Sequence, residues 1–245
     1  MSVTEKRIRV PQKTTDTTLT VNRVEHKYVI SASDAAQLAA KLPMMLQRDR
    51  HNGMNGYMVR SLYFDTAHNK DYYAKEDGIF ERHKIRLRIY SLQDKEIKLE
   101  CKSKKGDFQK KVSLILNREQ AQQLIKGNYG ILLDIGTADA VEMYVKIQGY
   151  KPAVIVQYNR KAFFWHTNDT RITIDNQVCG CETEFDLFSD KLPFTPAIHG
   201  NSQILEVKYN GKLEPSIARL LSGYDRTRTS FSKYNNTRRI RSLLK

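Results

Sequence analysis

Apolar and polar residues alternate with a period of two along much of the chain from Val21 onward, a pattern typical of β-strands. It predicts strands at residues 21–30, 56–65, 79–91, 95–104, 107–116, 153–165, 170–177, 180–185 and 203–209. Helical spacing is rarer, and it predicts helices from Ser33-Asp34 to about Leu42, at 118–126, at 138–148 and from Pro215 to near Gly223, with a short helical turn at Tyr72-Tyr73. Because strands outnumber helices and hairpin-like connections recur, we predict an α+β fold with helices around an antiparallel sheet or barrel.

Charged residues occupy one face of several predicted strands. Lys84, Arg86 and Arg88 alternate with aliphatic residues, and since side chains alternate between the two faces of a strand, these three cations share one face. The same spacing joins Glu25 with Lys27, Lys98 with Glu100 and Lys102, Tyr158 with Arg160, Arg171 with Thr173 and Asp175, and Glu206 with Lys208.

A charged strand face has two structural explanations. For one strand alone, the solvent-exposed side of an antiparallel sheet explains the charged residues. Across at least six strands, the lumen of a closed barrel becomes the second possibility. Each unpaired buried ion costs several kcal/mol, so a lumen lined by so many cations has to hold water or a polyanion.

The net charge strengthens the case for an anionic partner. The 245 residues include 41 Lys and Arg against 27 Asp and Glu, a formal charge of +14. Residues 82–111 carry eleven of these cations and four acids, and residues 226–245 carry seven cations and no acid, so each segment contributes +7. The alternative is a basic surface that meets nucleic acid or acidic lipid nonspecifically.

Composition also bounds the class of protein. No apolar run is long enough to cross a bilayer, the first residues lack the apolar stretch of a secretory signal, and the three cysteines cannot form a disulfide framework. We therefore expect a soluble cytoplasmic protein. Residues 1–20 are polar and without a period, which predicts a flexible N-terminal segment followed by one domain at 21–245.

With these residues in view, the sequence resembles the VTC domain, the catalytic module of polyphosphate polymerases, which belongs to the triphosphate tunnel metalloenzymes and is related to the CYTH group. The resemblance runs from about Val21 to Tyr234. It is carried, in order along the chain, by residues 25–28 (EHKY), 59–66 (VRSLYFDT), 84–90 (KIRLRIY), 99–102 (LECK), 158–160 (YNR), 171–175 (RITID), 204–208 (ILEVK) and 231–234 (FSKY).

The resemblance implies an antiparallel β-barrel that forms a tunnel, with phosphates held inside it. The phosphate-binding residues that it implies are Lys27, Arg86, Arg88, Lys102, Tyr158, Arg160, Arg171, Lys208 and Lys233, joined by Lys110 or Lys111. Lys27, Arg86, Arg88 and Glu206 are the implied catalytic residues, with Glu206 as the principal metal ligand, Glu25 as a second one, and Mn²⁺ or Mg²⁺ as the cofactor. Arginine guanidinium groups and lysine ammonium groups bind phosphate oxygens well. Mn²⁺ and Mg²⁺ are hard cations, which prefer oxygen ligands.

The implied activity is transfer of the γ-phosphoryl group of ATP to a growing inorganic polyphosphate chain. A tunnel triphosphatase, acting on inorganic or nucleoside triphosphates, and a polyphosphate-binding module without catalysis are the alternatives. Tunnel hydrolases of the CYTH group carry an ExExK pattern on the first strand, and here Arg23 replaces the first Glu, which favours the polymerase or the binder over the hydrolase.

The remaining motifs have ordinary structural interpretations. Cys179 and Cys181 have no second pair of ligands and predict a plain strand or turn rather than a metal site. His26 alternates away from Glu25 and Lys27 and is expected on the outer face. The basic run at 238–241 is either a solvated helix end or a contact with an anionic membrane surface, which would make the protein peripheral to the inner face of the membrane. No specific nucleic-acid partner is expected.

Overall fold

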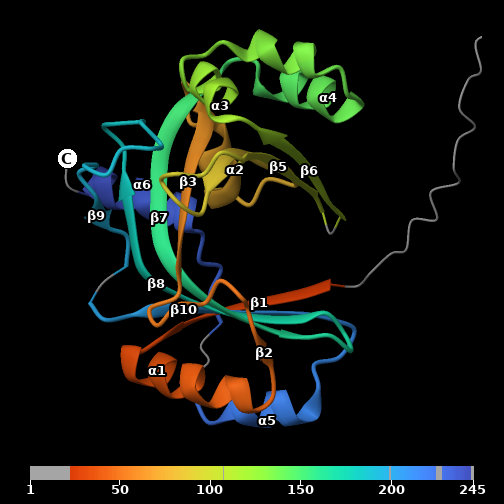
Figure 1. Ribbon diagram of the computed structural model, residues 1–245, viewed down its shortest axis with the longest axis vertical. Helices are drawn as coiled ribbons and strands as arrows, with labels where there is room; N and C mark the ends of the chain where they lie inside the picture. The colour runs from red at the N-terminus through yellow and green to blue at the C-terminus, as the bar shows by residue number, and fades with distance from the viewer. Residues whose placement is uncertain (1–22, 107, 199, 225–227, 244–245) are drawn as a thin grey trace, which may run out of the picture.

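The computed structural model describes residues 23–106, 108–198, 200–224 and 228–243. One antiparallel sheet forms its centre (Figure 1). Along the sheet the strands follow the order β1 (Arg23–Ile30), β10 (Gln203–Asn210), β8 (Thr170–Cys181), β7 (Tyr150–Trp165), β3 (Tyr57–Thr66), β4 (Glu81–Ile89), β5 (Ile97–Lys105) and β6 (Phe108–Leu116). Two short strands extend it, β2 (Gln47–Arg48) beside β7 and β9 (Thr195–Pro196) beside β8. The predicted α+β class with an antiparallel sheet is confirmed.

The sheet curls strongly, so that β1 and β10 lie opposite β5 and β6 (Figure 1). Within the described residues, hydrogen bonding does not close the sheet: β1 pairs with β10 and β6 pairs with β5, and no ladder joins β1 to β6. In place of the closed barrel that the family resemblance implied, the described part of the protein therefore has a curved sheet whose two edge strands, β1 and β6, are not hydrogen-bonded to each other.

Helices cover the convex face of this sheet. α1 (Ala32–Lys41) and α5 (Pro215–Ser222) pack on β10 and β8 through an apolar cluster, whereas α3 (Arg118–Ile125), α4 (Ala138–Ile147) and a 3₁₀ helix (Tyr129–Ile135) cover β4 to β6. The aliphatic residues of the alternating strands fill both clusters, and burial of this apolar surface is the main driving force for the fold. The polar face of each strand is consequently left on the concave side.

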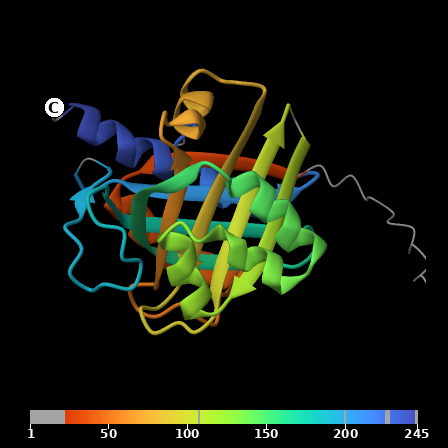
Figure 2. The same ribbon diagram turned by 90° about the horizontal axis from the view of Figure 1, so that it is seen from above.

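Two further helices lie together at one side of the sheet. α2 (Lys70–Glu76) contacts α6 (Lys233–Leu243), as Figure 2 shows. α6 lies so close to β8 that a Cβ atom added to Gly180 would overlap the Cγ2 methyl group of the Thr237 side chain. A larger residue at position 180 would therefore have to displace this side chain.

Two predictions of secondary structure are wrong. Residues 170–177 and 180–185 were expected as separate strands, but β8 is continuous from Thr170 to Cys181. The interruption in the pattern is a β-bulge against β7, where Gln177 adopts a left-handed φ of 50°. The first helix begins at Ala32 and is capped by Ser31, whose Oγ accepts from the backbone N–H of Asp34.

None of the described helices is long and apolar enough to cross a bilayer.

Candidate functional site

Strand register brings the charged residues of seven strands onto the concave face. Residues directly opposite in an antiparallel pair share a face, and the paired positions include Lys27 with Glu206, Arg160 with Asp175 and Arg86 with Glu100. We call this concave face the bore. Its charged side chains include Lys233, contributed by α6, and, from the strands, Glu25, Lys27, Lys84, Arg86, Arg88, Glu100, Lys102, Lys111, Arg160, Arg171, Asp175, Glu206 and Lys208.

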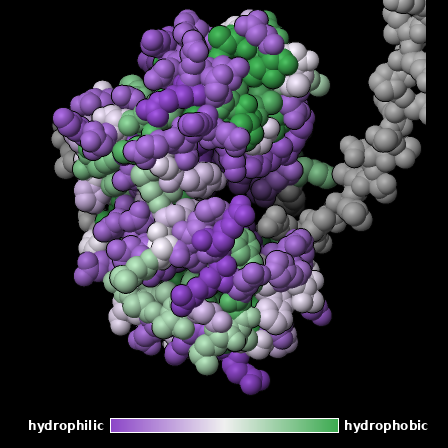
Figure 3. Space-filling model, viewed as in Figure 1, coloured by the Kyte–Doolittle hydropathy of each residue, from purple (hydrophilic) through white to green (hydrophobic). Residues whose placement is uncertain are grey.

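These bore residues comprise ten cations and four carboxylates, an excess of six positive charges. In the space-filling view, hydrophilic residues surround the recess between the two halves of the molecule (Figure 3). Every phosphate-binding position that the resemblance implied lies in the bore. The choice between Lys110 and Lys111 falls on Lys111, because Lys110 Nζ pairs with Glu142 Oε2 at 2.6 Å on the outer side.

At the centre of the bore a buried carboxylate holds two cations. Asp175 is fully buried, and it accepts from Arg160 Nε at 2.7 Å and from Arg160 Nη2 at 2.8 Å. Lys233 Nζ lies 2.6 Å from Oδ2 of the same carboxylate. Burial alone would raise the pKa of Asp175, but Lys233 and Arg160 lower it below its usual value. Asp175 therefore stays ionised and links α6 to the sheet.

A second cluster joins β1 and β10. Lys208 Nζ lies 2.5 Å from Glu206 Oε1 and 3.3 Å from Glu25 Oε2, so one ammonium group bridges the two carboxylates. Lys27 Nζ pairs with Glu25 at 2.8 Å. Burial would raise the pKa of Glu206, but Lys208 and Lys27 hold it well below its usual range. Glu206 is therefore an anion within a cationic site, as a ligand for a hard metal ion has to be.

A third cluster surrounds Glu100. Arg86 donates to this carboxylate at 2.8 Å through Nε, and Lys111 also pairs with it. Arg86 Nη1 donates to the hydroxyl of Tyr63 at 3.0 Å. Burial would raise the pKa of Tyr63, but Arg86 and Arg88 lower it to about 7. The positive field of the bore is thus strong enough to favour a phenolate on its wall.

Four bore cations have no carboxylate partner among the described residues: Lys84, Arg88, Lys102 and Arg171. Arg88 is 9% exposed and donates to Ser61 Oγ at 3.0 Å, so its only partners are uncharged. Arg171 donates to the hydroxyl of Tyr57 at 3.5 Å and lies over the ring of Phe164, and its Nε is buried without an acceptor. Lys102 forms no ion pair. Unsatisfied cations on a concave wall are the groups that an anionic ligand would bind.

The pKa values of two lysines in the bore are lowered by their surroundings. The Lys102 side chain is open to water, yet it stands inside the curve of the sheet. Burial by the surrounding protein, together with Lys208 and Arg86, lowers the pKa of Lys102 to about 8. Burial likewise lowers the pKa of Lys84 to about 8, and its Nζ donates to Ser232 Oγ at 2.8 Å. An anion bound nearby would raise both pKa values again.

Four residues of this site were given no role in it by the sequence. The alternating spacing places Lys84, Glu100 and Asp175 on the charged strand faces, but the family resemblance assigns none of them to phosphate or metal. Tyr63 carries no comparable signal, because an uncharged residue in an apolar strand says nothing about the arginine opposite. Its position against Arg86 comes from the β3–β4 register.

Two other predictions concern residues outside the bore. His26 lies on the outer side of β1 beside Tyr209, as expected, with 3.2 Å between Nε2 and the hydroxyl. In the basic C-terminal segment, Arg238 pairs with Glu182 at 3.1 Å and is largely buried, so this arginine forms an ion pair within the protein. Side chains from residue 240 onward lie outside the described part, as does the segment 1–20, and contact with a membrane stays a prediction.

Comparison with known proteins places this geometry in a family. The family model described as "VTC domain" matches residues 22–241, nearly the whole chain. The chain belongs to the VTC domain family. Among curated protein sequences, none matches this VTC domain.

Solved structures resemble this VTC domain in fold. A candidate adenylyl cyclase from Hippeastrum, reported to have a dominant triphosphatase activity, is 15% identical, with 89% of this chain and 95% of that chain covered at a TM-score of 0.53. A candidate adenylate cyclase from Bacillus halodurans is 12% identical, with 86% and 93% covered at a TM-score of 0.49. The first likeness supports the curled antiparallel fold.

The residues of this VTC domain fit a divalent cation in a limited way. Within the described residues, no group of three or more His, Cys, Asp or Glu side chains could hold a metal ion. Glu206 and Glu25 offer two carboxylates, and the ammonium group of Lys208 lies between them. A cation with one or two protein carboxylates, completed by phosphate oxygens and water, is the usual arrangement for Mg²⁺ and fits here.

Proposed function

We propose that this VTC domain is a phosphotransferase that binds a triphosphate and polyphosphate in its bore and lengthens the polyphosphate with the γ-phosphoryl group of ATP. One observation carries the proposal: the bore side chains named above comprise ten cations against four carboxylates, and four of the cations, Lys84, Arg88, Lys102 and Arg171, have no carboxylate partner among the described residues. A surface that only needed solubility would not place these groups on a concave wall. A linear polyanion supplies the missing charge along the whole bore.

The chemistry needs positioning and charge more than it needs a general base. A terminal oxygen of the acceptor polyphosphate attacks the γ-phosphorus of ATP, the bond from that phosphorus to the β–γ bridging oxygen breaks, and ADP leaves. The acceptor oxygen is already anionic at neutral pH, so no proton has to be removed. Arg86, Arg88 and Lys27 would hold the three phosphates in line, since fixed cations stabilise the charge that develops on the transferred group.

Glu206 would hold the metal ion, with Glu25 as the second carboxylate of the same cluster. Bound there, the ion would supply Lewis-acid chemistry and draw negative charge from the phosphate groups. For Glu206 to accept it, the Lys208 ammonium has to leave the carboxylate and turn toward a phosphate oxygen. We therefore assign Lys208 to phosphate binding in the loaded site.

A tunnel triphosphatase is the second candidate, because the Hippeastrum protein of similar fold is reported to have that activity. It differs from the polymerase only in the acceptor, which is water. The cationic Lys208 between Glu25 and Glu206 favours the polymerase, because two-metal activation of water needs carboxylates that are free to bind metal. A polyphosphate-binding module without catalysis is the third candidate.

The test incubates the purified protein with ATP and Mn²⁺ or Mg²⁺. Polyphosphate is followed on a stained gel and orthophosphate by a release assay. The polymerase gives long polymer and ADP, the triphosphatase gives orthophosphate without polymer, and the binding module gives neither while retaining polyphosphate in a filter-binding assay. Either of the last two results would overturn the proposed activity.

Site variants connect the activity to the bore. Arg88→Ala and Glu206→Gln should each lower the rate of polymer formation by at least about 100-fold, the scale of losing one charged group that stabilises a transition state. The matched controls Arg219→Ala on α5 and Glu119→Gln on α3 change exposed residues of the same types on the convex side, and they should retain the rate. Equal rates in all four variants would remove the bore from the mechanism.

A further inference from the structure

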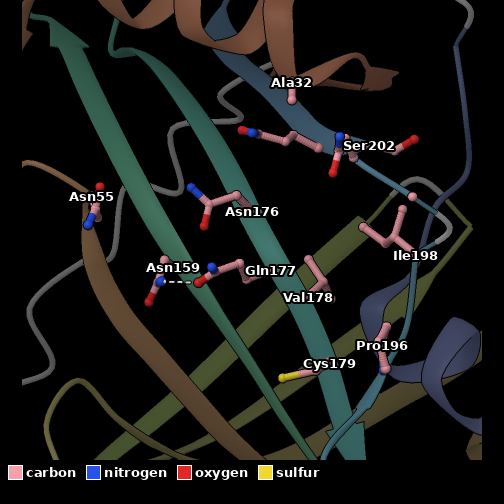
Figure 4. A pocket seen from close by; sticks show the side chains of 13 residues that line it. Ala32, Asn55, Asn159, Asn176, Gln177, Val178, Cys179, Pro196, Ile198 and Ser202 are labelled. Carbon is pink, nitrogen blue, oxygen red and sulfur yellow. Dashed lines mark hydrogen bonds between the residues drawn. The ribbon is translucent and has the colours of Figure 1, made fainter.

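A pocket of about 570 Å³ lies outside the bore, at the bulge between β7 and β8 (Figure 4). Its volume is within the usual range for small-molecule sites. Asn159 from β7 stands between Tyr158 and Arg160, which face the bore, so Asn159 faces the other way. The pocket therefore opens on the side of the sheet opposite the phosphate-binding residues.

The polar groups of this pocket are almost all carboxamides. Those contributed by the described residues come from five separate places in the fold, the loop before β3, β7, β8, the loop before β10 and the start of β10, and belong to Asn55, Asn159, Asn176, Gln177, Asn201 and Gln203. None of the described lining residues is charged, in a chain of which 28% of the residues are charged. None is aromatic either. We call these six residues the amide pocket.

Four of these six amides have no hydrogen-bond partner among the residues that the structure describes. Asn159 Nδ2 donates to Gln177 Oε1 at 2.7 Å, and the two side chains point toward each other in Figure 4. This is the only side-chain hydrogen bond that the six amides form among the described residues. Each amide offers two donors and an acceptor, so the pocket presents a large unused hydrogen-bonding capacity.

The bulge is what assembles the pocket. At Gln177 the chain takes a left-handed φ of 50°, a conformation unusual for a glutamine. The bulge shifts the register between β7 and β8, so that Asn159 faces Asn176 and Gln177 stands beside them. A regular strand would place successive side chains on opposite faces and could not set Asn176 and Gln177 along the same pocket.

We propose that the amide pocket binds an uncharged polyhydroxylated ligand, a sugar or polyol. A hydroxyl group both donates and accepts, as a carboxamide does, so several adjacent hydroxyls can each pair with an amide. An anionic ligand would find no cation among the described lining residues, and a cation would find no carboxylate. A nucleobase site is usually built around an aromatic side chain for stacking, which the described lining lacks. The proposal does not depend on the function of the bore.

The test follows the side-chain amide resonances of the whole protein by two-dimensional NMR during titration with D-glucose and, separately, sorbitol. The expected dissociation constant is on the order of millimolar, because a shallow polar site gains little from each hydrogen bond. The amide peaks that shift are assigned by their absence in Asn176→Leu and Asn55→Ala. Asn176→Leu is nearly isosteric, and Asn55→Ala lies in an exposed loop and serves if the first variant folds poorly.

Both variants should weaken polyol binding by about tenfold, the scale of one or two lost hydrogen bonds, and should retain tripolyphosphate binding. Glu206→Gln in the bore should retain polyol binding. If neither polyol shifts these peaks, or if the two pocket variants bind as the unchanged protein does, the proposal is wrong. Stronger binding of adenosine or orthophosphate than of either polyol in the amide pocket would also overturn it.

Discussion

The buried carboxylate of Asp175 offers the sharpest test of how the bore is held together. Asp175→Asn keeps the size and shape of the side chain but removes its charge. Arg160 and Lys233 would then remain side by side without the anion that lies 2.6–2.8 Å from both. Asp175 is completely buried, so water cannot take its place.

The size of the effect follows from this geometry. Breaking a buried ion pair by removing one partner costs about 3–5 kcal/mol, because a buried charge loses its compensation. For a protein of this size each kcal/mol corresponds to roughly 2–4 °C in melting temperature, which gives a decrease of roughly 6–20 °C. Asp134→Asn is the matched control, since Asp134 is exposed and forms no ion pair among the described residues.

The assay measures thermal unfolding with and without tripolyphosphate. A polyanion in the bore supplies the charge that the variant lacks, so tripolyphosphate should raise the melting temperature of Asp175→Asn more than that of the unchanged protein. The reasoning is refuted if the variant loses less than about 1 kcal/mol. It is also refuted if tripolyphosphate stabilises both proteins equally.

Three further predictions concern other parts of the bore. Burial raises the pKa of Glu100, but the neighbouring arginines lower it to about 2. The ionised Glu100 carboxylate therefore stabilises the folded protein fully above its unfolded pKa near 4.5, and this stabilisation is lost as the pH falls toward 2. Urea unfolding should therefore depend on pH more steeply in the unchanged protein than in Glu100→Gln over that range, and parallel curves would contradict this. Gly180→Ala should cost about 1–3 kcal/mol and expose α6 to proteolysis, and Thr237→Ala in the same chain should restore part of the loss. Lys102→Met should weaken tripolyphosphate binding about 10- to 100-fold as measured by calorimetry, whereas Lys105→Met at the exposed end of β5 should change it little.

The sequence predicts most of the sheet because alternation is a local property. β4, β5 and β10 each carry charge on one face and aliphatic residues on the other, and burial of the aliphatic face fixes which side turns inward. The shared face of the bore cations follows from the same rule. Which cation meets which carboxylate depends on register, and register is set by contacts between distant segments.

The parts that escape prediction are those set by tertiary contacts. α6 has a polar sequence without an apolar stripe, and it is held in place by Asp175, Tyr234 and the close approach at Gly180. The bulge at Gln177 looks like a break between two strands, because the period of two is interrupted there. The amide pocket is drawn from five segments, so no single stretch of sequence reveals it.

The β1–β10 ladder has a consequence for folding kinetics. It joins the strand that carries Glu25 and Lys27 to the strand that carries Glu206 and Lys208. His26 and Tyr209, in contact across this ladder, are 183 residues apart in the chain. Closing so long a loop is entropically costly, so this ladder is expected to form late, after more local hairpins such as β4–β5. A polyanion held by Lys27 and Lys208 on these two strands would then bind only the finished protein, and it would prolong the lifetime of the native state without accelerating its formation.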